Sequence, residues 1–87
     1  MYRVQTPAPA TVACYWPGRM SVEDVRSLGL ATALAYEAVT RKGASMSAVR
    51  DSYGVLQLAL SADGKVWSRA AGHSPAAVAG WRGSHAS

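Results

Sequence analysis

Two segments with the alternating pattern of a β-strand, one on each side of an Asp-Gly pair, restrict the possible folds of this chain more than any other feature of its sequence. Leucine occupies every second position toward the end of residues 55–60, as in a β-strand with one buried face. Asp63-Gly64 follows, a pair that readily takes the positive φ angles of two-residue hairpin turns. Because residues 65–71 alternate again, the sequence predicts an antiparallel hairpin here.

A long helix is predicted upstream of this hairpin, from Val22 to Lys42. Ser21 is the predicted N-cap because its hydroxyl can accept from an unpaired backbone N–H, and Asp24 completes a variant of the capping box. Gly43 supplies the left-handed residue that ends many helices. The helical period predicts one apolar face against the sheet: Val22, Val25, Leu28, Gly29, Thr32, Tyr36 and Val39.

Shorter patterns complete the predicted fold. Residues 11–16 and 46–51 are β-prone, residues 2–6 alternate like a half-buried strand, and residues 75–80 predict a short C-terminal helix. A single long helix can cover one face of an antiparallel sheet. The sequence therefore predicts an α+β two-layer sandwich with a three- to four-stranded sheet and the order β(β)-α-β-β-β.

Length, charge and cysteine content limit the possible functions. The 87 residues predict one domain, with an ordered core at about residues 2–81 and a flexible tail at 82–87. The formal net charge of +4 favours acidic partners. A single cysteine excludes an intrachain disulfide and fits a reducing cytoplasm, and no apolar segment is long enough to predict a membrane span.

The sequence shows no pattern typical of catalysis, metal binding or cofactor binding. The candidate nucleophile Cys14 would need a held histidine, but His73 lies in a predicted turn and His85 in the predicted tail. No Cys or His pair has the spacing of a metal site, and there is no glycine-rich phosphate loop. We therefore expect a non-enzymatic protein without a metal or cofactor, in which Cys14 is a small buried residue.

A second apolar line on the predicted helix is the first candidate binding surface. Leu30 and Leu34 project opposite the predicted core face, and Arg26 and Arg41 flank them. Two leucines one turn apart on an outer face suggest a partner groove or a homodimer. Two alternatives are that the C-terminal segment covers both leucines or that the helix has a different phase.

The second candidate surface is the strand face that carries Lys65, Trp67 and Arg69. An aromatic residue between basic residues can stack bases and hold phosphates. Trp and Arg are also enriched in protein-binding hot spots. A third interpretation is that Trp81 or the N-terminal strand covers Trp67.

The turns VRDSYG at residues 49–54 and ADGKVW at residues 62–67, downstream of a capped helix, resemble the core of small accessory proteins of phages and mobile elements, including anti-CRISPR proteins. This resemblance implies an inhibitor in the host bacterial cytoplasm that occludes a subunit of a CRISPR-Cas effector complex or another host protein. The basic charge favours direct protein contact over DNA mimicry.

The order α-β-β-β-α from residue 21 is also similar to double-stranded-RNA-binding domains. Those domains begin their second helix with a basic cluster, whereas residues 74–79 contain no Lys or Arg. A nucleic-acid-binding domain is therefore the alternative function, and a structural homodimer is a second alternative.

Overall fold

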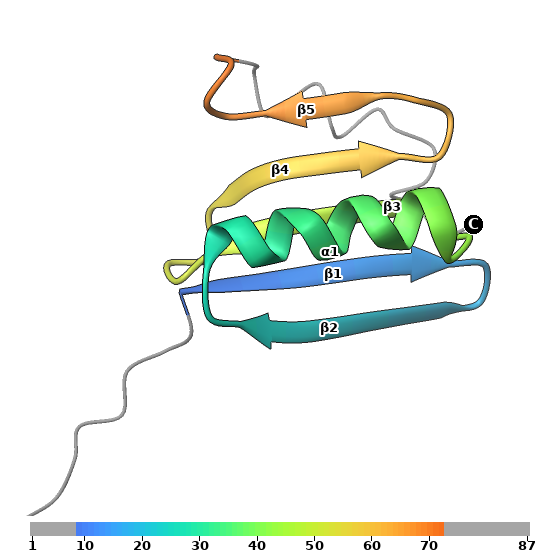
Figure 1. Cartoon of the computed structure of the whole chain (residues 1–87), viewed down its shortest axis with the longest axis horizontal. Helices are drawn as coiled ribbons and strands as arrows, with labels where there is room; N and C mark the ends of the chain where they lie inside the picture. Colours follow the sequence, from blue (N-terminus) through green and yellow to red (C-terminus); the bar gives the residue numbers. More distant parts are fainter. Residues whose placement is uncertain (1–8, 73–87) are drawn as a thin grey trace, which may run out of the picture.

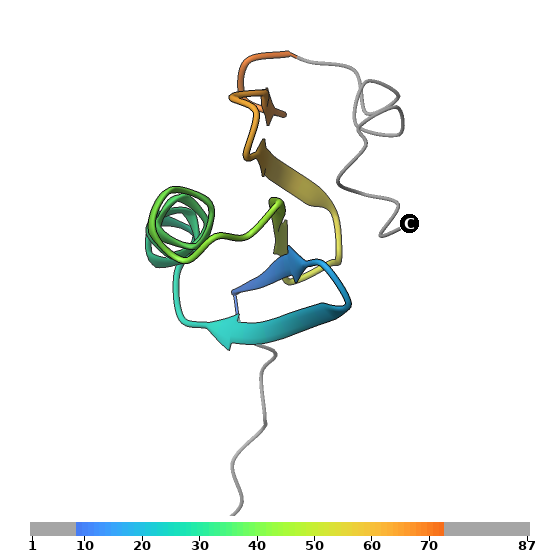
Figure 2. The same ribbon diagram turned by 90° about the vertical axis from the view of Figure 1, so that its right-hand side faces the viewer.

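The computed structural model describes residues 9–72, which form an α+β fold with one helix on one face of a five-stranded antiparallel sheet. Figure 1 shows the sheet order β2-β1-β3-β4-β5, and Figure 2 shows the helix on a single side of the sheet. The elements are β1 (Ala10–Trp16), β2 (Arg19–Val25), α1 (Leu28–Arg41), β3 (Met46–Asp51), β4 (Leu56–Ser61) and β5 (Val66–Ser68).

The segment before the helix differs most from the sequence-based prediction. Residues 19–25 form strand β2 instead of the first turns of a helix, and α1 begins at Leu28. The sheet therefore has five strands, and the prediction of three to four strands is wrong. Gly18, with φ of +75°, turns the chain after β1, so that β2 pairs with β1 along its whole length. The predicted cap at Ser21 is therefore wrong, and Ser27 caps α1 by accepting a hydrogen bond from the Leu30 N–H at 3.0 Å.

The face of α1 that meets the sheet also differs from the prediction. The fully buried helix residues are Ala31, Ala35 and Ala38, whereas Leu28 and Tyr36 of the predicted core face are exposed. Small side chains let a helix approach a sheet closely. This approach brings the buried Ser47 hydroxyl of β3 within 3.0 Å of the Ala35 carbonyl oxygen, to which it donates.

The predicted turns and the first two strands of the second half agree closely with the structure, whereas the last strand, β5, spans Val66–Ser68 instead of residues 65–71. β3 has the predicted bounds, and the predicted turns at residues 51–54 and 61–64 connect β3 to β4 and β4 to β5. The expectation that three leucines share one face is wrong for Leu56. A register shift between Val49 and Arg50 alters the pairing there, and Leu56 packs with the side chains on the face opposite α1.

Apolar side chains are buried on both faces of the sheet. The cluster under α1 contains Val12, Val49 and Leu60, and the cluster on the opposite face contains Met46 and Trp67. The predicted strand at residues 2–6, the helix at 75–80 and the tail at 82–87 lie outside the described residues. No helix within residues 9–72 is long and apolar enough to cross a membrane.

Candidate interaction surface

An open apolar groove lies between the C-terminal half of α1 and the β4–β5 hairpin. The groove has a volume of about 130 Å³. It forms because α1 packs mainly over β1 and β3, so β5 extends beyond the helix (Figure 1). The lining comes from one helix and one hairpin: Tyr36, Val39, Thr40, Leu60, Ser61, Gly64, Lys65 and Val66.

Two large apolar side chains on opposite walls of this groove are accessible to a partner. Tyr36 of α1 is 45% exposed, and Val66 of β5 is 48% exposed. Leu60 is buried at 3% exposure and belongs to the core cluster under α1, so the groove ends on the hydrophobic core. An aromatic residue, an aliphatic residue and an apolar floor are typical of a pocket that receives an apolar side chain of a protein partner.

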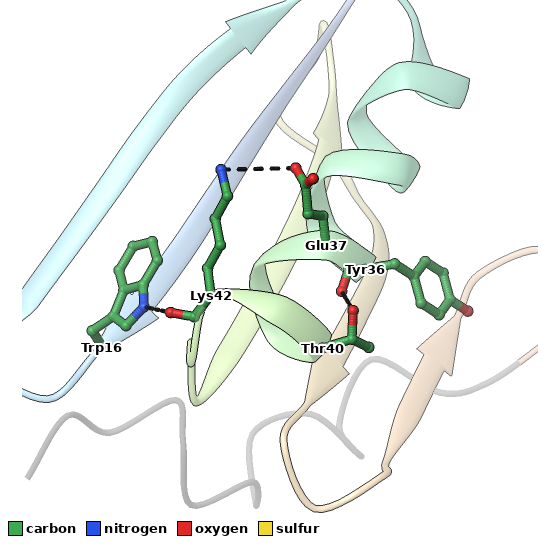
Figure 3. Close-up of polar contacts among 5 residues, drawn as sticks. All are labelled: Trp16, Tyr36, Glu37, Thr40 and Lys42. Carbon is green, nitrogen blue, oxygen red and sulfur yellow. Dashed lines mark hydrogen bonds and ion pairs between the residues drawn. The ribbon is translucent and has the colours of Figure 1, made fainter.

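Polar contacts hold the helical wall of the groove in place (Figure 3). The Trp16 indole N–H donates to the Lys42 carbonyl oxygen at 2.9 Å, which ties the end of α1 to β1. The Lys42 ammonium lies 3.7 Å from the Glu37 carboxylate, and the Thr40 hydroxyl donates to the Tyr36 carbonyl oxygen at 2.7 Å. Tyr36 projects from α1 on the side away from Trp16 (Figure 3), so it is available at the groove.

The four residues of the first predicted binding surface differ in exposure and in position relative to α1. Leu30 is 44% exposed, but Leu34 is half-buried and packs against the core cluster under α1. Arg26 and Arg41 are both exposed, yet they flank opposite ends of a 14-residue helix, which is about 20 Å long. These four residues therefore do not form one continuous patch.

The second predicted surface contains a buried tryptophan. Trp67 is only 1% exposed and lies in the cluster on the face opposite α1, so its ring does not offer an open stacking platform. The Arg69 guanidinium lies 5.7 Å from the Trp67 ring centroid, and its Nε donates to the Leu56 carbonyl oxygen at 2.9 Å. The Lys65 ammonium lies 3.7 Å from the Asp63 carboxylate.

Asp51 organises the turn between β3 and β4, next to the end of β5. Its carboxylate accepts hydrogen bonds from the Tyr53 and Val55 N–H groups and from the Gln57 side-chain amide. These bonds, the one from Val55 foremost, lower the pKa of Asp51. The Gln57 carbonyl oxygen accepts from the Arg69 N–H, so the same corner fastens β5 to β4.

Cys14 lies among the core residues under α1 and is 7% exposed. Burial raises the pKa of its thiol, and a hydrogen bond with Ser21 acts in the opposite direction. Among residues 9–72, no group of three or more His, Cys, Asp or Glu side chains could hold a metal ion. The other predicted candidates for nucleophilic chemistry, His73 and His85, lie outside the described residues.

Comparisons with protein-family models, curated proteins and solved structures find no match for this chain. The sequence-based interpretation missed both exposed walls of the groove. Tyr36 was assigned to the core face, because the helix was phased on its large apolar residues instead of its alanines. Val66 was placed correctly on the face opposite Trp67, but nothing in the sequence indicated that α1 stops short of β5.

Proposed function

We propose that this protein is a non-enzymatic binding module that inhibits or modulates a partner protein by covering part of its surface. The observation that carries the proposal is the apolar groove, where Tyr36 and Val66 are about half exposed above buried Leu60. Rigid aromatic side chains beside a small pocket are frequent anchors of protein interfaces. The resemblance to anti-CRISPR proteins makes a subunit of a bacterial CRISPR-Cas effector complex the first partner to test.

Protein contact is better supported than nucleic-acid contact by the placement of the basic strand face. Trp67 is buried, and Lys65 and Arg69 each contact another group of the chain. Stacking of unpaired bases needs an accessible ring beside basic side chains. The surface that the groove exposes is, in contrast, almost entirely apolar, and Lys65 is the basic residue among those that line it.

The proposal is tested with Tyr36→Asp and with the matched control Tyr53→Asp. Tyr53 lies in the β3–β4 turn and is 89% exposed, so it provides the same substitution outside the groove. We expect wild type and Tyr53→Asp to restore plaque formation by a phage targeted in a CRISPR-immune host. Tyr36→Asp should lose at least about 10-fold in affinity for the effector subunit, since about 1.4 kcal/mol corresponds to that factor.

Equal loss in both variants, or none in either, contradicts a role for the groove. If phage targeting is unaffected by the wild-type chain, the effector complex is not the partner, and the same three proteins are used to retain proteins from bacterial lysate. Retention of nucleic acid alone, with an affinity that falls steeply as salt increases, would instead support the alternative of a nucleic-acid-binding domain.

A further inference from the structure

Strand β2 forms a long and exposed edge of the sheet. It contains seven residues, of which Val25 alone is buried, and Met20 and Val22 are 56% and 60% exposed. Within residues 9–72, β2 pairs with β1 alone. Edge strands are commonly protected by charged side chains, proline, bulges or short length. β2 has no proline and no lysine, and its register with β1 is continuous, so its charged residues Arg19, Glu23 and Asp24 are the protection it carries.

The side chains of residues 19–23 in β2 divide by chemistry between the two faces of the sheet. Ser21 pairs with Cys14 of the cluster under α1, so Ser21 points toward the helix side. Arg19 and Glu23, two residues away in each direction, share that side because strand side chains alternate. Met20 and Val22 point to the opposite face. Within residues 19–23, the helix side of the edge thus carries a cation and an anion, and the other side carries two apolar residues, while Asp24 follows them on that second side.

This pattern is complementary to itself in one antiparallel register. We propose that two copies of the chain pair through β2 about a two-fold axis at Ser21, which joins their sheets into one. Arg19 of each copy then lies opposite Glu23 of the other, and Met20 lies opposite Val22. Directly opposed residues share a face in an antiparallel pair, so each contact joins compatible side chains and occurs twice.

The neighbouring symmetric register lacks this complementarity. A two-fold axis at Val22 places Met20 opposite Asp24 and Arg19 opposite Val25, which opposes apolar and charged side chains. The structure also prepares Arg19 for the proposed contact, because its guanidinium lies 4.1 Å from the Trp16 ring centroid on the adjacent strand. A flanking cation–π contact restricts the arginine without neutralising its charge.

The proposed pairing is independent of the proposed function. The groove lies beside β4 and β5, whereas β2 is at the opposite edge of the sheet. A dimer joined through β2 therefore leaves both grooves accessible and makes the module bivalent, which strengthens attachment to a partner with repeated subunits. Loss of dimerisation and loss of partner binding are separable, because they depend on different residues.

The first experiment is sedimentation velocity on the full chain across a concentration series at low salt. Wild type should shift with rising concentration from 9.1 kDa toward twice that mass. Val22→Lys should remain at the monomer mass, because it places a charge opposite Met20 of the second copy. Val66→Lys, the same substitution at a half-exposed valine of the other edge, should dimerise like wild type.

Charge reversal tests the register itself. Arg19→Glu and Glu23→Arg should each weaken the affinity of the dimer at least 10-fold. Each variant places two like charges opposite each other at both of the symmetry-related contacts. The double variant restores opposite charges and should regain most of the affinity. Circular dichroism checks that every variant keeps the fold.

Three results would overturn the proposal. The first is a wild type that stays monomeric at millimolar concentration, and the second is a double variant no tighter than the single ones. The third is a dimer abolished by Leu30→Asp but unaffected by Val22→Lys, which would place the interface on the helix.

Discussion

The two edges of the sheet are built in contrasting ways. β5 has three residues, and its central Trp67 is buried at 1% exposure. The Arg69 main chain and side chain bind carbonyl oxygens of β4, which closes that end of the strand. β2 has seven residues, and six of them are exposed. One edge is anchored by a large aromatic side chain, and the other is held mainly by its ladder to β1.

The difference shows how a small domain can divide stability and recognition between its edges. A short strand with a buried anchor offers little backbone to another chain, whereas a long exposed strand offers a template for pairing. The apolar groove lies beside the anchored edge, where α1 and the β4–β5 hairpin give it fixed walls. Substitution of the buried Trp67 in β5 should therefore change stability, and substitutions of exposed side chains in β2 should change self-association.

The largest effect is expected for Trp67→Ala, which removes the anchor of β5. Loss of a buried tryptophan should lower the free energy of unfolding by about 3–5 kcal/mol, measured by urea denaturation. Val66→Ala on the same strand is the control, and its effect should be much smaller because Val66 is about half exposed. Equal effects of the two substitutions would mean that Trp67 does not anchor this edge.

A smaller effect, dependent on pH, is expected for Asp51→Asn at the corner that holds β5. The pKa of Asp51 lies below its ordinary 3.8 in the folded protein, chiefly because its carboxylate accepts from the Val55 N–H. Its ionised form therefore stabilises the fold above that pH, and this contribution is lost as the pH falls through the folded-state pKa. The variant should melt below wild type at pH 7, and the difference in Tm should narrow below pH 3.8.

Asp24→Asn on β2 is the matched control for this measurement. Within residues 9–72 the structure shows no hydrogen bond or ion pair of the Asp24 carboxylate, so this variant should melt close to wild type at both pH values. A Tm difference for Asp51→Asn that stays constant from pH 7 to pH 3 would contradict the role assigned to its carboxylate.

The smallest effect on stability is expected for Val22→Thr on the exposed edge. Threonine keeps the branched shape that suits a strand, and the side chain is 60% exposed. The free energy of unfolding, measured at low protein concentration, should change by no more than about 0.5 kcal/mol. A loss comparable with that of Trp67→Ala would show that β2 contributes to the core, and the contrast between the edges would fail.

The predictions made from the sequence succeeded where the local chemistry allowed one answer. Asp63-Gly64 sits in the expected hairpin turn, and the alternation around it gave β4 nearly correct bounds, whereas β5 is shorter than the predicted residues 65–71. The start of the helix was wrong because Ser21 and Ser27 have the same capping chemistry. Local propensity cannot choose between them when pairing with β1 can extend the sheet to Val25.

The candidate site was less predictable than the fold. The sequence left open whether Leu30 and Leu34 are exposed or covered. In the structure Leu30 is exposed and Leu34 packs against the core, because the phase of a helix rich in alanine is ambiguous. Large apolar residues suggested one core face, and close packing of alanines selected another. Exposure of Tyr36 follows from that choice. Trp67 is buried instead among Met46, Ala48 and Ala59 on the face opposite α1, and contacts between separate strands of this kind are not encoded in a short sequence window.

The sequence by itself determined the α+β class, the two-layer arrangement and the turns of the second half, because the periodicity of apolar residues and glycine at positive φ act over a few residues. Tertiary structure decided which side of α1 meets the sheet, that residues 19–25 become an edge strand, and which aromatic side chains remain accessible. These outcomes depend on packing between distant segments. Because side chains from several segments fill each buried cluster together, the sequence of one segment does not show which of its residues will be buried.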